Sequence, residues 1–192
     1  KREMPLKEDI KKAEKQPENM FQLFAYLLLY TGCRRGEALA LTWDDIDFDN
    51  NLIYINKQLQ FQSNKPVIEN FTKSKAGIRT VPMLENLRAA LLPFKKNSGY
   101  VFSANGNLLT SKQFRDGWKS LGLSSTPHQF RHAYATTLYN AKIDAKTAQS
   151  LLGHSSVSVT LDVYTHISKN VANSAKEQLN NYISQSKFSQ KS

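Results

Sequence analysis

Apolar residues recur at helical spacing through the first part of the chain. Phe21, Phe24 and Leu27 lie on one helical face and look buried. This pattern ends at Gly32, which breaks it. The spacing predicts three early helices, over Leu6–Ala13, Asn19–Thr31 and Arg34–Leu41, with Leu6 and Ile10 as the core-facing pair of the first helix.

Alternating and β-branched residues follow, and they predict strands. The expected strands are Leu52–Lys57, Val67–Thr72 and Ile78–Met83. We interpret Phe61–Pro66 as a polar connection, and Lys73–Gly77 as the tip of a hairpin with glycine near its end. The three strands are expected to form a small antiparallel sheet.

Helical patterns return after the strands and continue to the C-terminal region. Pro127 suits the first turn of one helix, Asp144 and Ser156 suit N-caps, and Gly153 suits a helix end. The expected helices are Leu84–Leu92, Ser111–Leu121 with Ser111 as N-cap, His128–Asn140, Asp144–Leu152, Ser156–Val163 and Asn170–Ile183. The predicted fold class is therefore mainly α with a small three-stranded antiparallel β-sheet.

Composition narrows the class of protein. The 192 residues carry a formal net charge of +10, which favours a polyanionic partner such as DNA, RNA or an acidic membrane. Cys33 is the single cysteine, so no internal disulfide can form, and a reducing compartment is expected. The longest apolar run, Phe24–Tyr30, is too short to span a membrane, and no signal peptide is visible.

One stretch of the chain contains several side chains that could take part in catalysis. His128 and Arg131 are three apart and share a helical face, and His154 and Tyr164 follow them. Upstream, Arg34 lies in the sequence Thr-Gly-Cys-Arg-Arg-Gly-Glu. A guanidinium fork, two imidazoles and a phenol suit attack by a phenolic oxygen on a phosphodiester.

These motifs resemble the tyrosine recombinase family, the integrases of phages and conjugative transposons, over most of the chain. That family has the order Arg, Lys, His-x-x-Arg, His or Trp, and Tyr. The matching positions here are Arg34, Lys73, His128, Arg131, His154 and Tyr164, in the contexts TGCRRGE, HQFRH, LLGH and YTH.

The resemblance implies a role for each residue. Tyr164 is the expected nucleophile, which forms a 3′-phosphotyrosine bond and frees a 5′-hydroxyl. Arg34 and Arg131 are the expected phosphate clamp, because guanidinium forks give paired hydrogen bonds to phosphate oxygens. His128 and His154 are expected to assist proton transfer and phosphate binding, with His128 the better proton acceptor.

Some assignments have rivals. Lys73 is the expected general acid, and Lys75 is its alternative because hairpin length varies in the family. Arg35 competes with Arg34, but the family pattern favours Arg34, with Glu37 orienting that arginine. Arg79 is read as a backbone phosphate contact or a solubility residue of the hairpin.

His132 follows His128 by four residues, a spacing that zinc sites use. The Glu of a zinc-protease motif is replaced by Gln129, and no third ligand is evident. We therefore expect no metal and no nucleotide cofactor, and we interpret His132 as a helix-packing residue.

The resemblance also implies an organisation. Residues 1–183 are expected to form the catalytic domain, 184–192 a disordered tail, and the N-terminal DNA-binding domain is expected to be absent from this chain. The implied partners are double-stranded DNA, other protomers in a tetramer on two duplexes, and accessory DNA-bending or directionality proteins, in the bacterial cytoplasm at the nucleoid.

Two alternatives remain at this point. A type IB topoisomerase shares the same catalytic chemistry but acts as a monomer on supercoiled DNA. A non-catalytic DNA-binding module would form no covalent adduct, and the complete set of catalytic residues argues against it.

Overall fold

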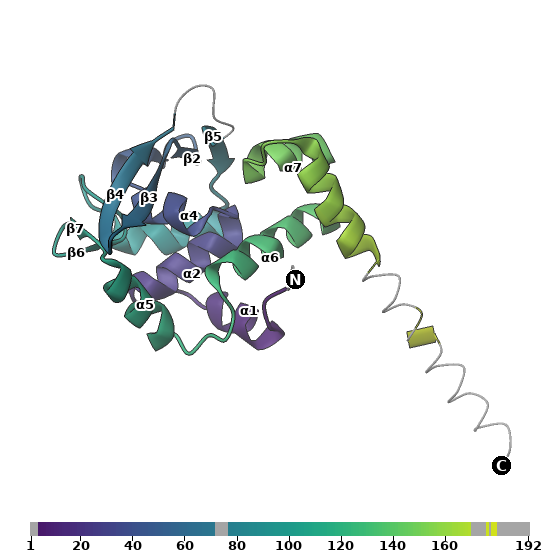
Figure 1. Ribbon diagram of the computed structural model, residues 1–192, viewed down its shortest axis with the longest axis horizontal. Coiled ribbons are helices and arrows are strands. Elements are labelled where there is room, and N and C mark those ends of the chain that lie inside the picture. The colour runs from purple at the N-terminus through teal and green to yellow at the C-terminus, as the bar shows by residue number, and fades with distance from the viewer. Residues whose placement is uncertain (1–3, 72–76, 170–175, 177, 180–192) are drawn as a thin grey trace, which may run out of the picture.

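The computed structural model describes residues 4–71, 77–169, 176 and 178–179. Helix α2 (Met20–Thr31) lies at the centre and packs against the first, third, fourth and sixth helices (Figure 1). The surrounding helices are α1 (Lys7–Ala13), α3 (Arg35–Ala40), α4 (Glu85–Leu91), α5 (Ser111–Ser120) and α6 (Pro127–Asn140), with 3-10 turns η1 (Trp43–Asp45) and η2 (Leu92–Phe94).

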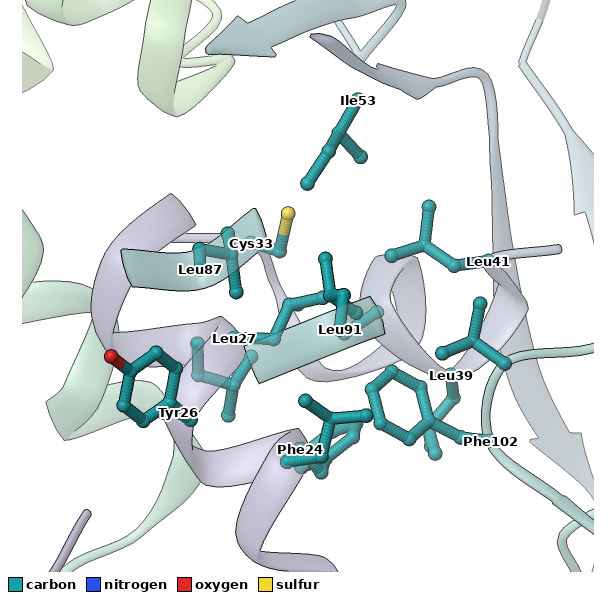
Figure 2. Packing of buried hydrophobic residues seen from close by; sticks show 14 of the residues in the cluster. Phe24, Tyr26, Leu27, Cys33, Leu39, Leu41, Ile53, Leu87, Leu91 and Phe102 are labelled. Atoms are coloured by element: carbon teal, nitrogen blue, oxygen red, sulfur yellow. The ribbon is translucent and has the colours of Figure 1, made fainter. Parts of the chain in front are cut away.

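Helix α2 is buried on almost every side, as its continuous apolar run requires. Asn19 caps its first turn, because the side-chain oxygen accepts hydrogen bonds from two backbone N–H groups of that turn. Gly32 ends it in the left-handed conformation at φ +62°. Figure 2 shows Phe24 and Leu27 of α2 packed among side chains of the neighbouring helices and of Phe102. This core fixes the position of Gly32 and of the residues that follow it.

The strands form two main antiparallel sheets. The three-stranded sheet has the order β1–β2–β5, and β3 pairs with β4 in a separate hairpin. A third, two-residue pair, β6 with β7, encloses a turn at Asn105 and Gly106, both at positive φ. The bounds are β1 (Ile46–Asp47), β2 (Leu52–Ile55), β3 (Lys57–Gln62), β4 (Lys65–Asn70), β5 (Arg79–Pro82), β6 (Ser103–Ala104) and β7 (Asn107–Leu108).

The three-stranded sheet was expected, but its strands differ from those that alternation predicted. The segment Phe61–Pro66 is not a simple connection, because β3 and β4 run through it and turn at Ser63 and Asn64, both at positive φ. The strands on either side of 72–76 pair with β3 and β2 rather than with each other. The expected hairpin tip itself falls largely outside the described residues.

Helix α7 (Ala145–Leu152) and the helical residues 157–169 lie beyond the end of α6 (Figure 1). They pack with α6 in a second, smaller apolar cluster around Tyr134, Leu138 and Leu152. The Asp144 side chain caps α7, and Gly153 ends it at φ +64°, both as the sequence predicts. The mainly α fold class with a small antiparallel sheet is confirmed.

Two local predictions are wrong and two cannot be compared. Thr110, not Ser111, is the N-cap of α5, because its hydroxyl accepts from the Gln113 backbone N–H. Leu6 is exposed rather than core-facing. The expected helix 170–183 and tail 184–192 lie almost entirely outside the described residues. Within the part of the chain that is described, no helix has the length and apolarity needed to cross a membrane.

Candidate active site

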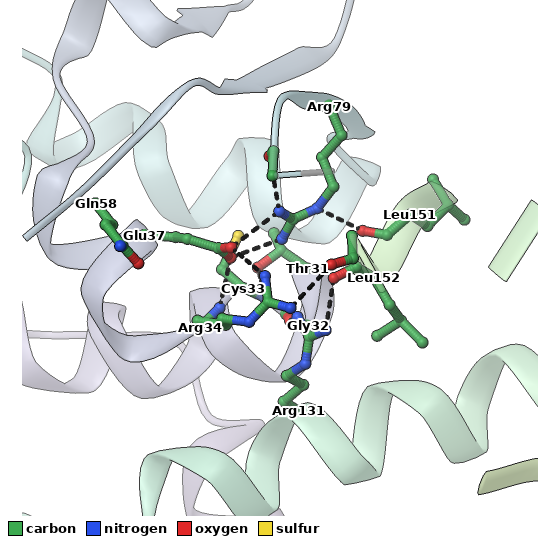
Figure 3. A network of polar contacts seen from close by, with 12 residues as sticks. Thr31, Gly32, Cys33, Arg34, Glu37, Gln58, Arg79, Arg131, Leu151 and Leu152 are labelled. Carbon is green, nitrogen blue, oxygen red and sulfur yellow. Dashed lines mark hydrogen bonds and ion pairs between the residues drawn. The ribbon is translucent and has the colours of Figure 1, made fainter. Parts of the chain in front are cut away.

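Two arginines from different elements share one buried carboxylate, that of Glu37 in α3 (Figure 3). Arg79 of β5 donates from Nη1 to Oε1 at 3.0 Å and from Nη2 to Oε2 at 2.7 Å. Arg34, which precedes α3, donates from Nη1 to Oε1 at 2.7 Å. Its backbone N–H donates to Oε2 at 2.7 Å. Glu37 therefore orients Arg34, as the sequence predicts, and also joins it to the sheet.

The C-terminal turn of α7 also binds the arginines, through its backbone carbonyls. Three successive backbone carbonyls accept from three guanidinium groups: Leu151 from Arg79, Leu152 from Arg131, and Gly153 from Arg34. The last carbonyls of a helix have no partner within the helix and carry its partial negative charge. The Leu-Leu-Gly turn is thus a cation-binding helix end that holds Arg34, Arg79 and Arg131 together.

Arg131 is also held from the other side. Its Nη1 donates to the carbonyl of Gly32, the residue that ends α2, at 2.7 Å. Two helix C-termini therefore meet at this guanidinium, and Arg131 as a whole is only 5% exposed. The glycine ends of α2 and α7 position the arginine that α6 supplies.

The charges of the cluster shift its pKa values. Burial alone would raise the pKa of Glu37, but the hydrogen bonds and charge of Arg79, joined by those of Arg34, lower it to about 2. Burial and the nearby charge of Arg34 lower the pKa of Arg131 to about 9. Both groups are charged at neutral pH, so three arginines against one carboxylate leave an excess of positive charge suited to an anion.

A cavity of about 230 Å³ opens beside these arginines. We call it the arginine–histidine cavity. The polar side chains that line it are Arg34, His128, Arg131, His132 and His154, and its apolar lining is Ala135, Leu152, Val159 and Val163. The structure thus brings together four of the six residues predicted from the sequence.

The histidines of the cavity are held by further contacts. His154 Nδ1 lies 2.8 Å from the hydroxyl of the buried Thr160, which fixes the orientation of the ring. His128 and His132 meet through their Nε2 atoms at 3.1 Å, one helical turn apart on α6. His132 is therefore not the packing residue that we expected, because it lines the cavity and contacts His128.

Tyr164 lies outside the arginine–histidine cavity, although Val163 lines it. The Tyr164 hydroxyl donates to the carbonyl of Ile143 at 3.0 Å, and its ring meets that of Tyr139 edge-on with centroids 5.2 Å apart. Burial and the charge of Asp144 raise the pKa of the phenol. The predicted nucleophile is thus held against the second apolar cluster.

The remaining predicted residue, Lys73, lies outside the described residues, as does its rival Lys75. The prediction that Arg79 contacts a DNA phosphate or keeps the hairpin soluble is wrong. Arg79 is 9% exposed, and its side chain donates hydrogen bonds to Glu37 and to the carbonyl of Leu151. Strand alternation could have shown this, because Arg79 shares the buried face of β5 with Val81. Among the described residues, no group of three or more His, Cys, Asp or Glu side chains could hold a metal ion.

Comparison with known proteins shows the family of this chain. The phage integrase family model matches residues 6–171, and the chain belongs to that family. A XerC-like tyrosine recombinase of Caldanaerobacter subterraneus subsp. tengcongensis is 31% identical over an alignment of 205 residues, gaps included. The alignment covers 90% of this chain and 52% of that protein. The transposase of transposon Tn916 from Enterococcus faecalis is 29% identical, over 80% of this chain and 44% of that protein. The chain spans about half the length of these curated relatives.

Solved structures show the same fold. The Tn1549 transposon integrase (residues 82–397 of that protein) in complex with circular intermediate DNA has a TM-score of 0.72 and 25% identity, over 92% of this chain and 67% of that one. The XerA recombinase has a TM-score of 0.64 over 92% of this chain and 63% of that one. At 24% identity, the likeness to XerA concerns the fold alone.

Proposed function

We propose that this chain is the catalytic domain of a site-specific DNA recombinase, or integrase, which cleaves and rejoins strands through a 3′-phosphotyrosine. One observation carries the proposal. Arg34 and Arg131, which come from segments 97 residues apart, line one cavity with His128 and His154, and the helical residues that carry Tyr164 form part of its wall. The order and spacing of these residues in the family motif support the same conclusion.

In this proposal the cavity binds the scissile phosphate. Arg34 and Arg131 donate to the non-bridging oxygens, on which negative charge grows in the transition state. Both guanidinium groups are already fixed by carbonyls of the α7 turn, and Glu37 fixes Arg34 as well. Little reorganisation is then needed when the charge develops, which is the condition for strong electrostatic stabilisation.

Tyr164 is the proposed nucleophile. Its phenolic oxygen forms a bond to phosphorus while the bond from phosphorus to the 5′-oxygen breaks, and the energy of the ester is kept for rejoining. The bond of the hydroxyl to Ile143 and its raised pKa both oppose attack from the present position. Cleavage therefore requires Tyr164 to leave Ile143 and enter the cavity, where His128 accepts its proton.

Lys73 remains the proposed general acid that protonates the departing 5′-oxygen. It lies in the segment 72–76, between β4 and β5. The assignment is supported by the family motif, which the sequence Thr-Lys-Ser-Lys-Ala-Gly-Ile-Arg-Thr-Val-Pro from Thr72 to Pro82 resembles.

The proposed partner is double-stranded DNA. The +10 charge favours a nucleic acid, and the similar Tn1549 integrase was solved in complex with circular intermediate DNA. We also propose that residues 1–183 act with a DNA-binding domain N-terminal to them. Four protomers would assemble on two duplexes, with accessory DNA-bending or directionality proteins, in the bacterial cytoplasm.

A type IB topoisomerase is the rival reading, and strand exchange separates the two. The full-length protein is incubated with two labelled duplexes that carry the ends of its mobile element, and with a supercoiled plasmid that lacks them. A recombinase joins strands between the two duplexes and leaves the plasmid supercoiled. Plasmid relaxation without any exchange would favour the topoisomerase and overturn the proposal.

A further inference from the structure

A second cavity, of about 520 Å³, adjoins the arginine–histidine cavity. We call it the Arg35 cavity. Arg34, His128 and Arg131 line both cavities, so the two meet along these side chains. A strand whose phosphate lies against Arg34 and Arg131 has the Arg35 cavity directly beside it.

Arg35 is the cation that distinguishes the second cavity from the first. It is exposed, and its guanidinium carbon lies 5.8 Å from the ring centroid of Phe61 and 5.6 Å from that of Phe114. Both distances fall within the range of cation–π attraction. Phe114 is buried in the main core and Phe61 packs against it, so the two rings are a fixed support. The charge is therefore held in place before any ligand arrives.

The donors of Arg35 are not used within the described part of the protein. Arg34, Arg79 and Arg131 all donate to carbonyls or to Glu37, whereas no carboxylate or carbonyl among the described residues accepts from the Arg35 side chain. The aromatic rings attract the guanidinium without taking its N–H groups. Its forked edge stays able to donate to a ligand.

Strand β3 supplies the lining residues Gln58–Phe61 of the Arg35 cavity, and none of these four side chains is charged. The amides of Gln58 and Gln60 both donate to the carboxylate of Glu69 on β4, at 2.7 and 2.6 Å. Glu69 is not among the residues that line the cavity. Arg35 and the shared arginines set the sign of the cavity, which suits an anion.

We propose that Arg35 binds the backbone phosphate next to the scissile phosphate on the cleaved strand, an inference that rests on the proposed function. A phosphate fits better than a base, because the cavity adjoins the clamp proposed for the scissile phosphate, and the arginines that line it, Arg34, Arg35 and Arg131, face no acidic lining residue. Two parallel N–H groups match two phosphate oxygens. Such a contact holds the strand in register on the clamp and carries no sequence information.

Single methylphosphonate substitutions test this inference, because each removes the charge of one phosphate. Affinity of the full-length protein is measured by fluorescence anisotropy on its recombination-site duplex, with the neutral linkage placed at each of three positions on either side of the scissile phosphate. The variants are Arg35→Ala, Arg35→Lys and Phe61→Leu. Lys11→Ala, which removes an exposed charge of α1 that lines neither cavity, is the control.

At the phosphate next to the scissile one, the neutral linkage is expected to weaken the parent roughly tenfold, as loss of a charge-assisted contact does. Arg35→Ala should bind unmodified DNA roughly tenfold more weakly and lose nothing further at that position. Arg35→Lys and Phe61→Leu should fall between the parent and Arg35→Ala. Lys11→Ala should follow the parent at every position.

Additive losses at every position, or parent-like binding by Arg35→Ala, would overturn the inference. A loss that depends on the base pair rather than on the charge would also overturn it, in favour of base readout. Failure of the proposed function is seen separately, since it would remove covalent attachment by the parent without changing this pattern of binding.

Discussion

Glu37 should be the carboxylate on which the arginine cluster depends, and Glu37→Gln tests this directly. The side chain is fully buried and accepts from Arg79 twice and from Arg34 twice. Its replacement keeps the shape of the residue and removes the charge. The buried guanidinium of Arg79 then lacks its counter-ion, which is the costly way to break a buried ion pair.

The magnitude follows from the pKa of Glu37, which falls from 4.5 to about 2 on folding. One pKa unit is about 1.36 kcal/mol, so the charged form contributes about 3 kcal/mol to the free energy of unfolding. Because the folded pKa is lowered, this contribution is complete above pH 4.5 and is lost as the pH falls from 4.5 toward 2. About half or more of it should be gone at pH 3.

Urea denaturation of the parent and of Glu37→Gln at pH 7 and pH 3 measures the effect. The variant should be less stable by about 3 kcal/mol at pH 7, and the gap should shrink by about 2 kcal/mol at pH 3. Asp116→Asn is the matched control, because Asp116 forms an exposed pair with Lys112 that should contribute little. A gap below about 1 kcal/mol at pH 7, or an equal gap at both pH values, would mean that the charge of Glu37 does not hold the arginine cluster together.

Three further changes probe other parts of the site. Arg131→Ala should lower single-turnover cleavage by roughly 10²–10³-fold, the cost of losing one transition-state donor. Gly153→Ala should lower the urea midpoint, because a left-handed residue with a side chain costs roughly 1–2 kcal/mol and its Cβ would lie 2.7 Å from Arg79 Nη1. Lys73→Ala should cleave ordinary DNA slowly and a 5′-phosphorothiolate substrate at a near-parent rate, because a thiolate leaves without an acid.

A control variant or a second substrate accompanies each of these changes. Gly122→Ala has a similar φ of +61° but meets nothing within 4 Å, so it should be less destabilising than Gly153→Ala. Equal losses would mean that contact with Arg79 is unimportant. Arg131→Ala should stay slow on the sulfur substrate, and rescue there would contradict its role as clamp. If Lys75→Ala is the variant that sulfur rescues, Lys75 and not Lys73 is the acid.

Local patterns predicted the helices well because their signals lie close together in the sequence. The apolar run of α2 ends at Gly32, and α7 has its cap at Asp144 and its stop at Gly153. Strand pairing could not be predicted in the same way, because β2 joins β5 across some 25 residues, and alternation does not name a partner. The residues Ser63 and Asn64 are typical of a tight turn between two strands, although we interpreted the segment around them as a polar connection.

In the site too, the residues of a sequence motif could be predicted, but contacts between distant segments could not. The family motif named Arg34, His128, Arg131 and His154, which do meet at one cavity. The motif could not reveal that backbone carbonyls of the α7 turn hold the arginines, because such contacts depend on the packing of α7 against β5 and α6. It also could not show that the Tyr164 hydroxyl is bonded to the Ile143 carbonyl.

Covalent attachment of DNA through Tyr164 can be tested by peptide mapping of a trapped adduct. The full-length protein is incubated with a nicked suicide duplex that carries its recombination site. The covalent product is then digested with trypsin and nuclease and read by mass spectrometry. We expect the peptide that contains Tyr164 to carry a 3′-linked nucleotide, and Tyr164→Phe to bind the duplex without forming an adduct. A nucleotide on any other residue, a 5′ linkage, or an adduct formed by Tyr164→Phe would contradict this expectation.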